Sequence, residues 1–273
     1  MIKNFSIDLG SNTLKVAYID DGKLKNLEEV LNLGLYYENE NIIEKGIEIL
    51  LKTFSKLALK FDLKNAKVVA TAIFRKSKNA NEIIKILENK FGFRLRILSQ
   101  DDEAKFTRLG VGINGDFTLV DVGGYSTEIS SNNKKLLLDI GLLSFYKFYK
   151  LQNKDIRAYT EDVFKPYLKQ IQEFKKPIVL ASKTGIFAKS LIDNIGYFDL
   201  DDLSYHNAIL YKYELMNLIN FLENNNLEKR EWLVGKNRDF AVLCGAYFLD
   251  VMFDCDEFII SAYGLKEGIL FYT

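Results

Sequence analysis

Two stretches of this chain follow one pattern and decide its fold: IDLGSNTLKVAYIDDGKLK, residues 7–25, and VDVGGYSTEISSNNKKLLL, residues 120–138. In each stretch an apolar strand runs into an Asp, passes through a small turn to a Thr, and continues as a second strand that ends at a hairpin. Because the same features recur in the same order, the sequence predicts two halves of similar fold that face each other across a cleft.

The turn in each copy is suited to binding an anion. The Gly that follows the strand-end Asp permits a tight turn, and the small polar residues after it leave backbone N–H groups pointing outward. Such a concave nest of N–H groups most often binds phosphate. Asp8 and Asp121 stand where the strands end, and we expect them to hold a hydrated Mg2+ beside that phosphate. The alternative is a pair of ordinary hairpins, and the recurrence of Asp, Gly and Thr in order argues against it.

Composition restricts the class of protein. The chain has 273 residues, 48% of them hydrophobic, which is enough for two modest domains. Its 37 Lys and Arg balance 37 Asp and Glu, so bulk charge does not favour a nucleic-acid or membrane partner, and a polyanion must be bound locally. A single His206 with two distant cysteines, Cys244 and Cys255, disfavours a zinc site. With no signal-peptide pattern, we expect a cytoplasmic protein.

The remaining pattern predicts an α/β architecture in both halves. Three antiparallel strands are followed in the first half by alternating helix and strand, and the second half repeats this opening and is richer in helix. We expect helices at residues 41–61 and 81–90 and strands at residues 23–30, 66–70, 94–98, 178–181 and 258–261. The predicted domains are residues 1–115 and 116–263, with a hinge near residue 115 and a C-terminal helix at about 264–273 that packs back on the first domain.

The segment ILSQDDEAKFTRLGV, residues 97–111, is the second informative stretch. Ser99 followed by Asp102 is typical of a capping box, so a helix should begin at about Gln100. Asp101 and Asp102 then lie at the positive end of the helix dipole. Glu103 is left without a capping role, and taken alone it would be a solvated residue of the helix face.

Three runs together resemble a known family: residues 70–111, LVDVGGYSTEIS at residues 119–130, and SAYGLKEGIL at residues 261–270. They resemble the exopolyphosphatase and guanosine pentaphosphate phosphatase family (Ppx/GppA), in a short two-domain form without the extra C-terminal helical domain of longer members. The resemblance extends from Phe5 to Phe271. It implies duplicated actin-like domains, of the ribonuclease H-like superfold shared with sugar kinases, around a central cleft that contains the active site.

The resemblance also implies roles for individual residues. Glu103 matches the catalytic base that activates water. Asp121 and Glu128 match the acidic pair that binds Mg2+ (or Mn2+) or orients the water, and Asp8 matches the acid of the first loop. The expected phosphate-binding residues come from the two loops and one nearby Arg: Ser11, Asn12, Thr13, Arg75, Gly123, Gly124, Tyr125, Ser126 and Thr127.

Three departures from the family pattern affect the substrate-binding surfaces. Tyr125 stands where a third Gly is common, and we expect its ring to turn outward so that its hydroxyl or face meets the substrate. Ser182, Lys183 and Thr184 replace a common Gly-Gly-Thr, and we expect the Lys183 ammonium to add positive charge that favours polyphosphate over guanosine pentaphosphate. Lys266 replaces an Arg and loses its bidentate fork.

Three functions remain open from the sequence. The first is a Mg2+-dependent phosphohydrolase that acts on inorganic polyphosphate or guanosine pentaphosphate, which the retained acids favour. The second is a weak or inactive binder that senses the same anions, which the altered loops favour. The third is an ATP-dependent kinase of the same superfold, because phosphate loops alone do not separate hydrolysis from transfer. We expect neither a nucleic-acid nor a membrane partner, and a homodimer is left open.

Overall fold

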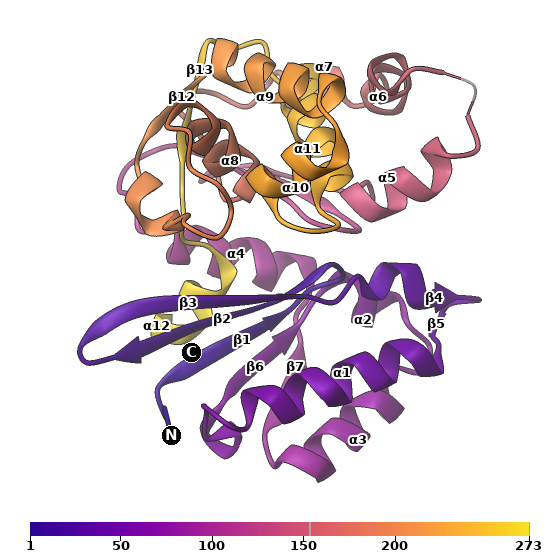
Figure 1. The fold of residues 1–273 in the computed structure, drawn as a ribbon, viewed down its shortest axis with the longest axis vertical. Coiled ribbons are helices and arrows are strands. Elements are labelled where there is room, and N and C mark those ends of the chain that lie inside the picture. Colours follow the sequence, from indigo (N-terminus) through magenta and orange to yellow (C-terminus); the bar gives the residue numbers. More distant parts are fainter. Residues whose placement is uncertain (153, 273) are drawn as a thin grey trace. The chain divides into compact units, whose positions relative to one another are not determined.

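The computed structural model describes residues 1–152 and 154–272 of the chain (Figure 1). These residues form two compact units. Unit 1 comprises Met1–Gly112, Gly123–Tyr125 and the segment from Tyr263 onward, and unit 2 comprises Ile113–Val122 and Ser126–Ala262. Three residues of the segment between two strands of unit 2 therefore belong to unit 1.

Unit 1 is built on a five-stranded mixed sheet with the strand order β3-β2-β1-β6-β7. The first three strands are antiparallel, whereas β1, β6 and β7 are parallel. The strands are β1 (Phe5–Leu9), β2 (Thr13–Asp20), β3 (Lys23–Val30), β6 (Lys67–Ala70) and β7 (Arg94–Ile97). A separate short ladder joins β4 (Tyr37–Glu38) and β5 (Asn41–Ile42). The predicted strand at residues 23–30 is confirmed with its bounds.

Helices cover both faces of this sheet (Figure 1). On one face α1 (Glu44–Leu57) and α3 (Ala80–Phe91) bury apolar side chains against Phe5, Ile7 and Leu9 of β1. Successive side chains of a strand point to opposite faces. Ser6 and Asp8 therefore face the other side, where the Ser6 hydroxyl donates to the Lys266 carbonyl of α12 (Leu265–Tyr272). The burial of β1 thus fixes the face on which Asp8 lies.

The remaining elements of unit 1 are short or lie beside α12. They are the 3-10 helices η1 (Leu33–Tyr36) and η2 (Leu63–Asn65), and the helices α2 (Ala72–Lys76) and α4 (Gln100–Gly110). The helix predicted over residues 41–61 is shorter, because Asn41 and Ile42 form β5 and α1 begins only at Glu44. Helix α2 is absent from the prediction, because five residues are too few to show a helical period.

Unit 2 repeats the strand arrangement of unit 1. Its six-stranded sheet has the order β10-β9-β8-β11-β13-β12, with β10, β9 and β8 antiparallel and β8, β11 and β13 parallel. The strands are β8 (Thr118–Val122), β9 (Thr127–Ser130), β10 (Lys135–Leu138), β11 (Ile178–Leu180), β12 (Ile209–Tyr211) and β13 (Glu257–Ile260). Apart from the edge strand β12, both sheets follow one topology, so the predicted duplicated α/β fold is confirmed.

Helices make up most of the rest of unit 2. They are α5 (Leu142–Tyr149), α6 (Ile156–Phe164), α7 (Leu168–Ile171), α8 (Lys183–Ile192), η3 (Asp202–Tyr205), α9 (Lys212–Asn224), α10 (Leu227–Val234) and α11 (Asp239–Met252). The α11 side chain Phe248 packs between Phe145 and Phe164, with ring centroids 5.0 and 4.8 Å away. Among the helices of the described residues, none is long and apolar enough to cross a membrane.

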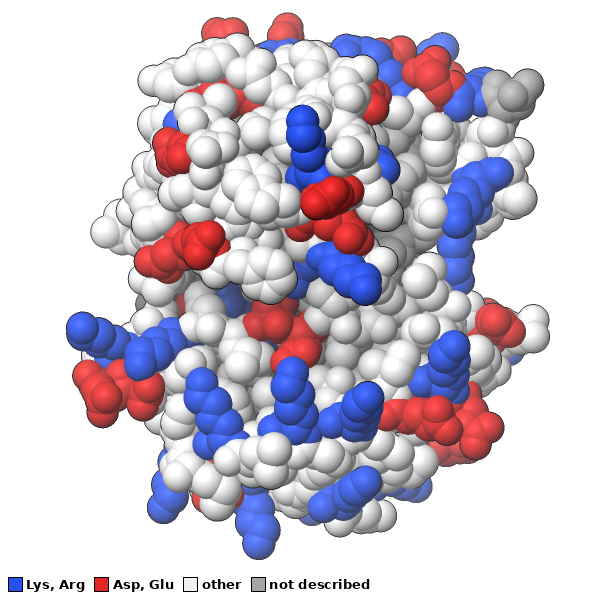
Figure 2. Space-filling view, in the orientation of Figure 1, with Lys and Arg blue, Asp and Glu red and all other residues white. Residues whose placement is uncertain are grey.

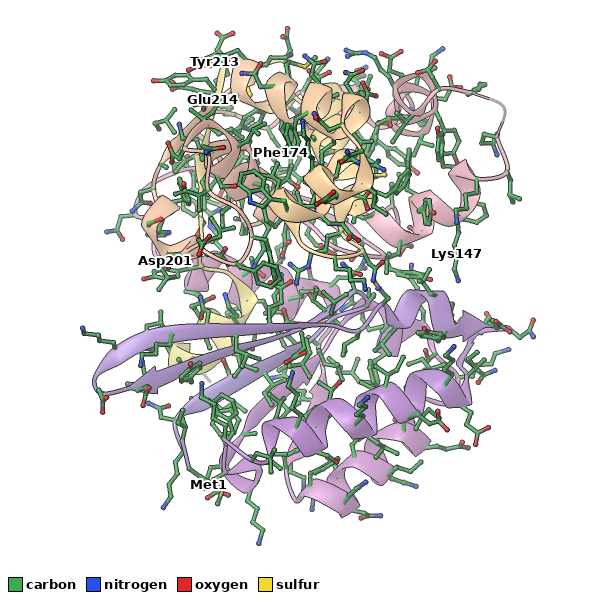
Figure 3. The ribbon with its side chains drawn as sticks, viewed as in Figure 1. Met1, Lys147, Phe174, Asp201, Tyr213 and Glu214 are labelled. Atoms are coloured by element: carbon green, nitrogen blue, oxygen red, sulfur yellow. The ribbon has the colours of Figure 1, made fainter. Side chains whose placement is uncertain are left out.

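Polar contacts fix the ends of these helices as well. Glu214, labelled in Figure 3, lies at the start of α9. Its carboxylate accepts a hydrogen bond from the Tyr211 backbone N–H at 2.9 Å and pairs with the Lys189 ammonium of α8 at 2.8 Å. Both partners sit on neighbouring elements, so one nearly buried carboxylate ties α9 to β12 and to α8.

The contact of α4 with α12 depends on two glycines. A Cβ atom on Gly110 would lie 1.9 Å from the Gly264 carbonyl oxygen, and one on Gly268 would lie 1.9 Å from the Phe106 carbonyl oxygen. Both obstacles are backbone atoms, which cannot turn aside as a side chain can. The absence of a Cβ at these positions lets the two helices approach closely.

We predict that Gly268→Ala lowers the free energy of unfolding by about 3 kcal/mol, the upper end of the usual cost of overpacking, because the methyl group would have to push two helices apart. The measurement is chemical denaturation followed by circular dichroism. Lys105→Ala, at an exposed position of α4, is the control and should change the value by less than about 0.5 kcal/mol. Equal unfolding curves for Gly268→Ala and wild type would contradict the close packing.

Candidate functional site

Glu103 lies in the first turn of α4, and the predicted helix start with Ser99 as N-cap is confirmed. Helix α4 begins at Gln100, and the Ser99 side chain accepts a hydrogen bond from the Asp102 N–H at 3.1 Å. The Asp102 carboxylate is bound by Arg96 at 2.6 Å. Glu103 follows in the first turn and, at 9% exposed, is buried rather than solvated. A carboxylate in such a place is not explained by solubility or by capping.

Glu103 is held by Arg75, a contact that the sequence did not predict. One terminal nitrogen of Arg75 donates to the Glu103 carboxylate at 2.5 Å and to the Leu98 carbonyl oxygen at 2.9 Å. Both side chains are largely buried, with 18% and 11% of their side-chain surface exposed. The other terminal nitrogen of Arg75 is buried and has no hydrogen-bond partner among the described residues. Arg75 therefore orients Glu103 and keeps a second donor available for an anion.

The first loop, which contains Ser11, Asn12 and Thr13, is supported from behind by the segment Leu31–Gly34. The N–H groups of Leu31 and Asn32 donate to the Asn12 carbonyl at 2.8 Å, and the Gly34 N–H donates to the Ser11 carbonyl at 3.1 Å. In a trans peptide the C=O of one residue and the N–H of the next point in opposite directions. The N–H groups of Asn12 and Thr13 therefore point away from the supporting segment, as an anion nest requires.

The second loop joins β8 to β9 and places two acids opposite each other. Asp121 and Glu128 are direct partners in the antiparallel ladder, and Val122 pairs with Thr127 next to them. Directly opposed residues have Cβ atoms about 5 Å apart, and like charges in such a pair destabilise the sheet. Thr127 is fully buried, and its hydroxyl donates to the Ile140 carbonyl at 2.7 Å. A cation bound between the two carboxylates would relieve their repulsion.

The first copy differs at the matching position. Asp8 on β1 is directly opposite Lys15 on β2, and Lys15 is in turn opposite Glu28 on β3. These three opposed residues alternate in charge across the sheet of unit 1, whereas in unit 2 the acid Asp121 is opposed by a second acid, Glu128. Within the described residues, no group of three or more His, Cys, Asp or Glu side chains could hold a metal ion. A pair of carboxylates fits Mg2+, which takes few protein ligands and keeps several waters.

Tyr125 does not turn outward, so this expectation is wrong. Its ring is 6% exposed, and its hydroxyl donates to the Gly34 carbonyl at 2.8 Å. The ring edge meets Tyr37, with centroids 5.9 Å apart and planes at 80°. Tyr125 is not among the positive-φ positions of the described residues, so a side chain there causes no backbone strain. Burial, followed by the effect of Tyr37, raises the pKa of Tyr125 to about 12.

The expected positive charge of Lys183 is offset within unit 2. Lys183 opens α8, and its ammonium lies 2.9 Å from the Asp202 carboxylate of η3. The basis for expecting a preference for polyphosphate from this residue is therefore removed. Lys266 is paired too, because its ammonium lies 2.7 Å from the Glu267 carboxylate. The other Glu267 oxygen accepts the Gly264 N–H at 2.8 Å at the start of α12.

The visible surface is mixed in charge. On the face shown in Figure 2, Lys and Arg side chains are interspersed with Asp and Glu side chains. This agrees with the equal numbers of the two kinds, 37 each, in the sequence. Bulk charge on this face therefore does not favour a polyanion, as expected from the sequence.

Comparison with solved structures identifies the class of fold. A crystal structure of the Ppx/GppA family member of Aquifex aeolicus has 24% identity, with 97% of this chain and 95% of that chain covered and a TM-score of 0.71. A crystal structure of an exopolyphosphatase from Cytophaga hutchinsonii has 20% identity, with 98% and 96% covered and a TM-score of 0.79. These likenesses, together with the repeated sheet topology, define the duplicated actin-like α/β fold.

Comparison of the sequence identifies the family. The model of the Ppx/GppA phosphatase family matches residues 27–273, and the chain belongs to this family. A curated relative, the guanosine-5'-triphosphate,3'-diphosphate pyrophosphatase of Pseudoalteromonas atlantica, is 30% identical over 143 residues. That alignment covers 47% of this chain and 28% of the relative, so the chain matches little more than a quarter of that protein.

We predict that Arg75→Leu lowers the free energy of unfolding by about 2–3 kcal/mol, because it leaves the Glu103 carboxylate buried without its cation. The double variant Arg75→Leu/Glu103→Leu should recover most of this loss, as a double-mutant cycle would measure. Arg94→Leu, which breaks the exposed pair with Glu88, is the control and should cost less than about 1 kcal/mol. Additive effects of the two substitutions would show that Arg75 does not support Glu103.

Proposed function

We propose that this chain is a metal-dependent phosphohydrolase that releases terminal phosphate from inorganic polyphosphate or from the 5' end of guanosine pentaphosphate. The observation that carries the proposal is the buried Glu103 carboxylate, oriented by Arg75 at 2.5 Å. Membership of the Ppx/GppA phosphatase family supports it. So do the relatives, because one is named a guanosine-5'-triphosphate,3'-diphosphate pyrophosphatase and another an exopolyphosphatase.

In this proposal Glu103 is the general base. A water molecule attacks the terminal phosphorus, its oxygen forms the new P–O bond, and its proton passes to the Glu103 carboxylate. The bridging P–O bond breaks, and the electron pair leaves with the shortened phosphate chain. Arg75 keeps the base in one orientation and offers its second terminal nitrogen to a phosphate oxygen. No phosphorylated residue of the protein is required.

The two loops have separate tasks in the proposed reaction. The N–H groups of Asn12 and Thr13 bind phosphate oxygens, since their peptide carbonyls are engaged on the other side. Asp121 and Glu128 would hold the cation, Mg2+ or Mn2+, which would neutralise charge on the phosphoryl group. Asp8 remains a predicted ligand of the first loop, although the β1–β2 ladder sets Lys15 opposite to it.

A binder without catalytic activity is the second candidate, and Tyr125 is the observation that favours it. Its buried ring occupies a place where the family commonly has Gly, next to the segment that supports the first loop. A protein that recognises the same anions without hydrolysing them needs the loops but has no need for Glu103.

One assay separates the two candidates. Phosphate release is measured from polyphosphate, guanosine pentaphosphate and ATP, each with Mg2+ and with a chelator. The proposal expects release from at least one of the first two substrates, lost with chelator, and little from ATP. Binding of these anions without any release would favour the binder and contradict the hydrolase.

We predict that Glu103→Gln lowers the turnover number by at least about a hundredfold, because the amide has the shape of the acid but does not accept the proton. Substrate binding, measured by calorimetry, should persist. Asp101→Asn, exposed in the same helical turn, is the control and should keep near-normal turnover. Near-normal turnover of Glu103→Gln would remove its assignment as the base.

We predict that Asp121→Asn and Glu128→Gln each raise the Mg2+ concentration for half-maximal activity at least about tenfold, because each removes one anionic ligand. The measurement is a Mg2+ titration of phosphate release at saturating substrate. Asp139→Asn, at an exposed position of unit 2, is the matched control. An unchanged Mg2+ requirement in both variants would count against this pair as the metal site.

A further inference from the structure

Tyr125 connects the segment between β8 and β9 with unit 1. Gly123, Gly124 and Tyr125 belong to unit 1, while the strands on either side, β8 and β9, belong to unit 2. The Tyr125 ring is buried, and its hydroxyl is bonded to a backbone carbonyl of unit 1. In the segment Gly123–Tyr125, Tyr125 is therefore the one residue whose side chain can hold the backbone in place, because the other two are glycines.

A sequence of hydrogen bonds connects Tyr125 with the first loop. The Tyr125 hydroxyl donates to the Gly34 carbonyl at 2.8 Å, and the Gly34 N–H donates to the Ser11 carbonyl at 3.1 Å. The neighbouring N–H of Asn32 binds the Asn12 carbonyl at 2.8 Å. The segment Leu31–Gly34 thus holds the first loop through its N–H groups and receives Tyr125 on the Gly34 carbonyl.

The ring of Tyr125 also connects the second loop with α2. It packs edge to face with Tyr37, whose hydroxyl donates to the Lys76 carbonyl at 2.9 Å. The Lys76 ammonium lies 6.0 Å from the Tyr125 ring centroid, at the outer limit of a cation–π contact. Lys76 follows Arg75, the residue that orients Glu103. The Tyr125 side chain therefore contacts the support of the first loop through a hydrogen bond and, through Tyr37, the end of α2 that contains Arg75.

We propose that Tyr125 is a positioning residue, which fixes the second phosphate loop to the support of the first loop before any phosphate binds. Two consecutive glycines give Gly123–Gly124 wide conformational freedom, and ordering them on binding would cost affinity. The anchored Tyr125 lowers that cost, because the loop is already held at one end. The proposal rests on the proposed function only in taking phosphate as the ligand.

The first arm of the test measures order without any ligand. We expect Tyr125→Phe and Tyr125→Gly to speed amide hydrogen exchange at residues 31–36 and 121–128, with Gly the faster of the two. Tyr18→Phe is the matched control, because Tyr18 is also 6% exposed, lies in unit 1, and has a hydroxyl bonded to Lys60. Exchange at these residues that is no faster than in Tyr18→Phe would overturn the proposal.

The second arm measures binding of inorganic pyrophosphate with Mg2+ by calorimetry, at a temperature at which all variants are folded. Loss of the hydroxyl in Tyr125→Phe should raise the dissociation constant about two- to tenfold, which corresponds to the net free energy of one hydrogen bond. Tyr125→Gly should raise it further. Tighter binding by Tyr125→Gly would show that the ring blocks the loop and would overturn the proposal. If wild type binds no pyrophosphate, the proposed function and the phosphate part of this proposal fail, and the exchange arm still decides whether Tyr125 holds the loop.

Discussion

The direct opposition of Asp121 and Glu128 across β8 and β9 is the constraint on which the proposed site depends. Val120, Val122 and Ile129 lie in the core of unit 2, so the pairing of these strands has one register. A slip of one residue would move the acids to the core and the apolar residues out of it. The same burial that stabilises the sheet therefore sets two carboxylates opposite each other, and in the proposed site a divalent cation would offset their repulsion.

The two copies of the hairpin differ in charge at one matching position of the ladder. The position opposite the strand-end Asp is Lys15 in unit 1 and Glu128 in unit 2. With Lys15 the ladder sets an ammonium side chain opposite the Asp8 carboxylate, so this pair lacks the like-charge repulsion of the second copy. With Glu128 the ladder carries two carboxylates, which in the proposed function would hold the cation. The duplication explains the shared geometry, and under the proposed function the change from Lys15 to Glu128 would explain why the acidic pair lies in the second copy.

The sequence predicted what depends on local pattern and missed what depends on distant contacts. Both hairpins and the Ser99 cap follow from neighbouring residues, and the structure has them. Arg75 and Glu103 are 28 positions apart in the sequence, and Tyr125 and Gly34 are 91 positions apart. Hydrophobic periodicity indicates helices and strands, and it does not indicate which distant side chains come into contact. The sequence predicts an unpaired positive charge at Lys183, because Asp202, its partner in the structure, lies 19 positions away and no local pattern indicates the pair. Glu103 was recognised through the family resemblance, since its helix pattern alone indicated a solvated position.

The short helix α2 shows how the chemistry depends on the core. A helix of five residues has no stability of its own in water, so its position must come from packing. Ile73 and Phe74 are fully buried in the core of unit 1 and supply that packing. The last two residues of α2 then serve the site, since Arg75 binds Glu103 and the Lys76 carbonyl receives the Tyr37 hydroxyl that backs Tyr125. Substitutions that loosen Ile73 or Phe74 would therefore disturb Glu103, the proposed base, and the contact of Tyr125 with Tyr37 together.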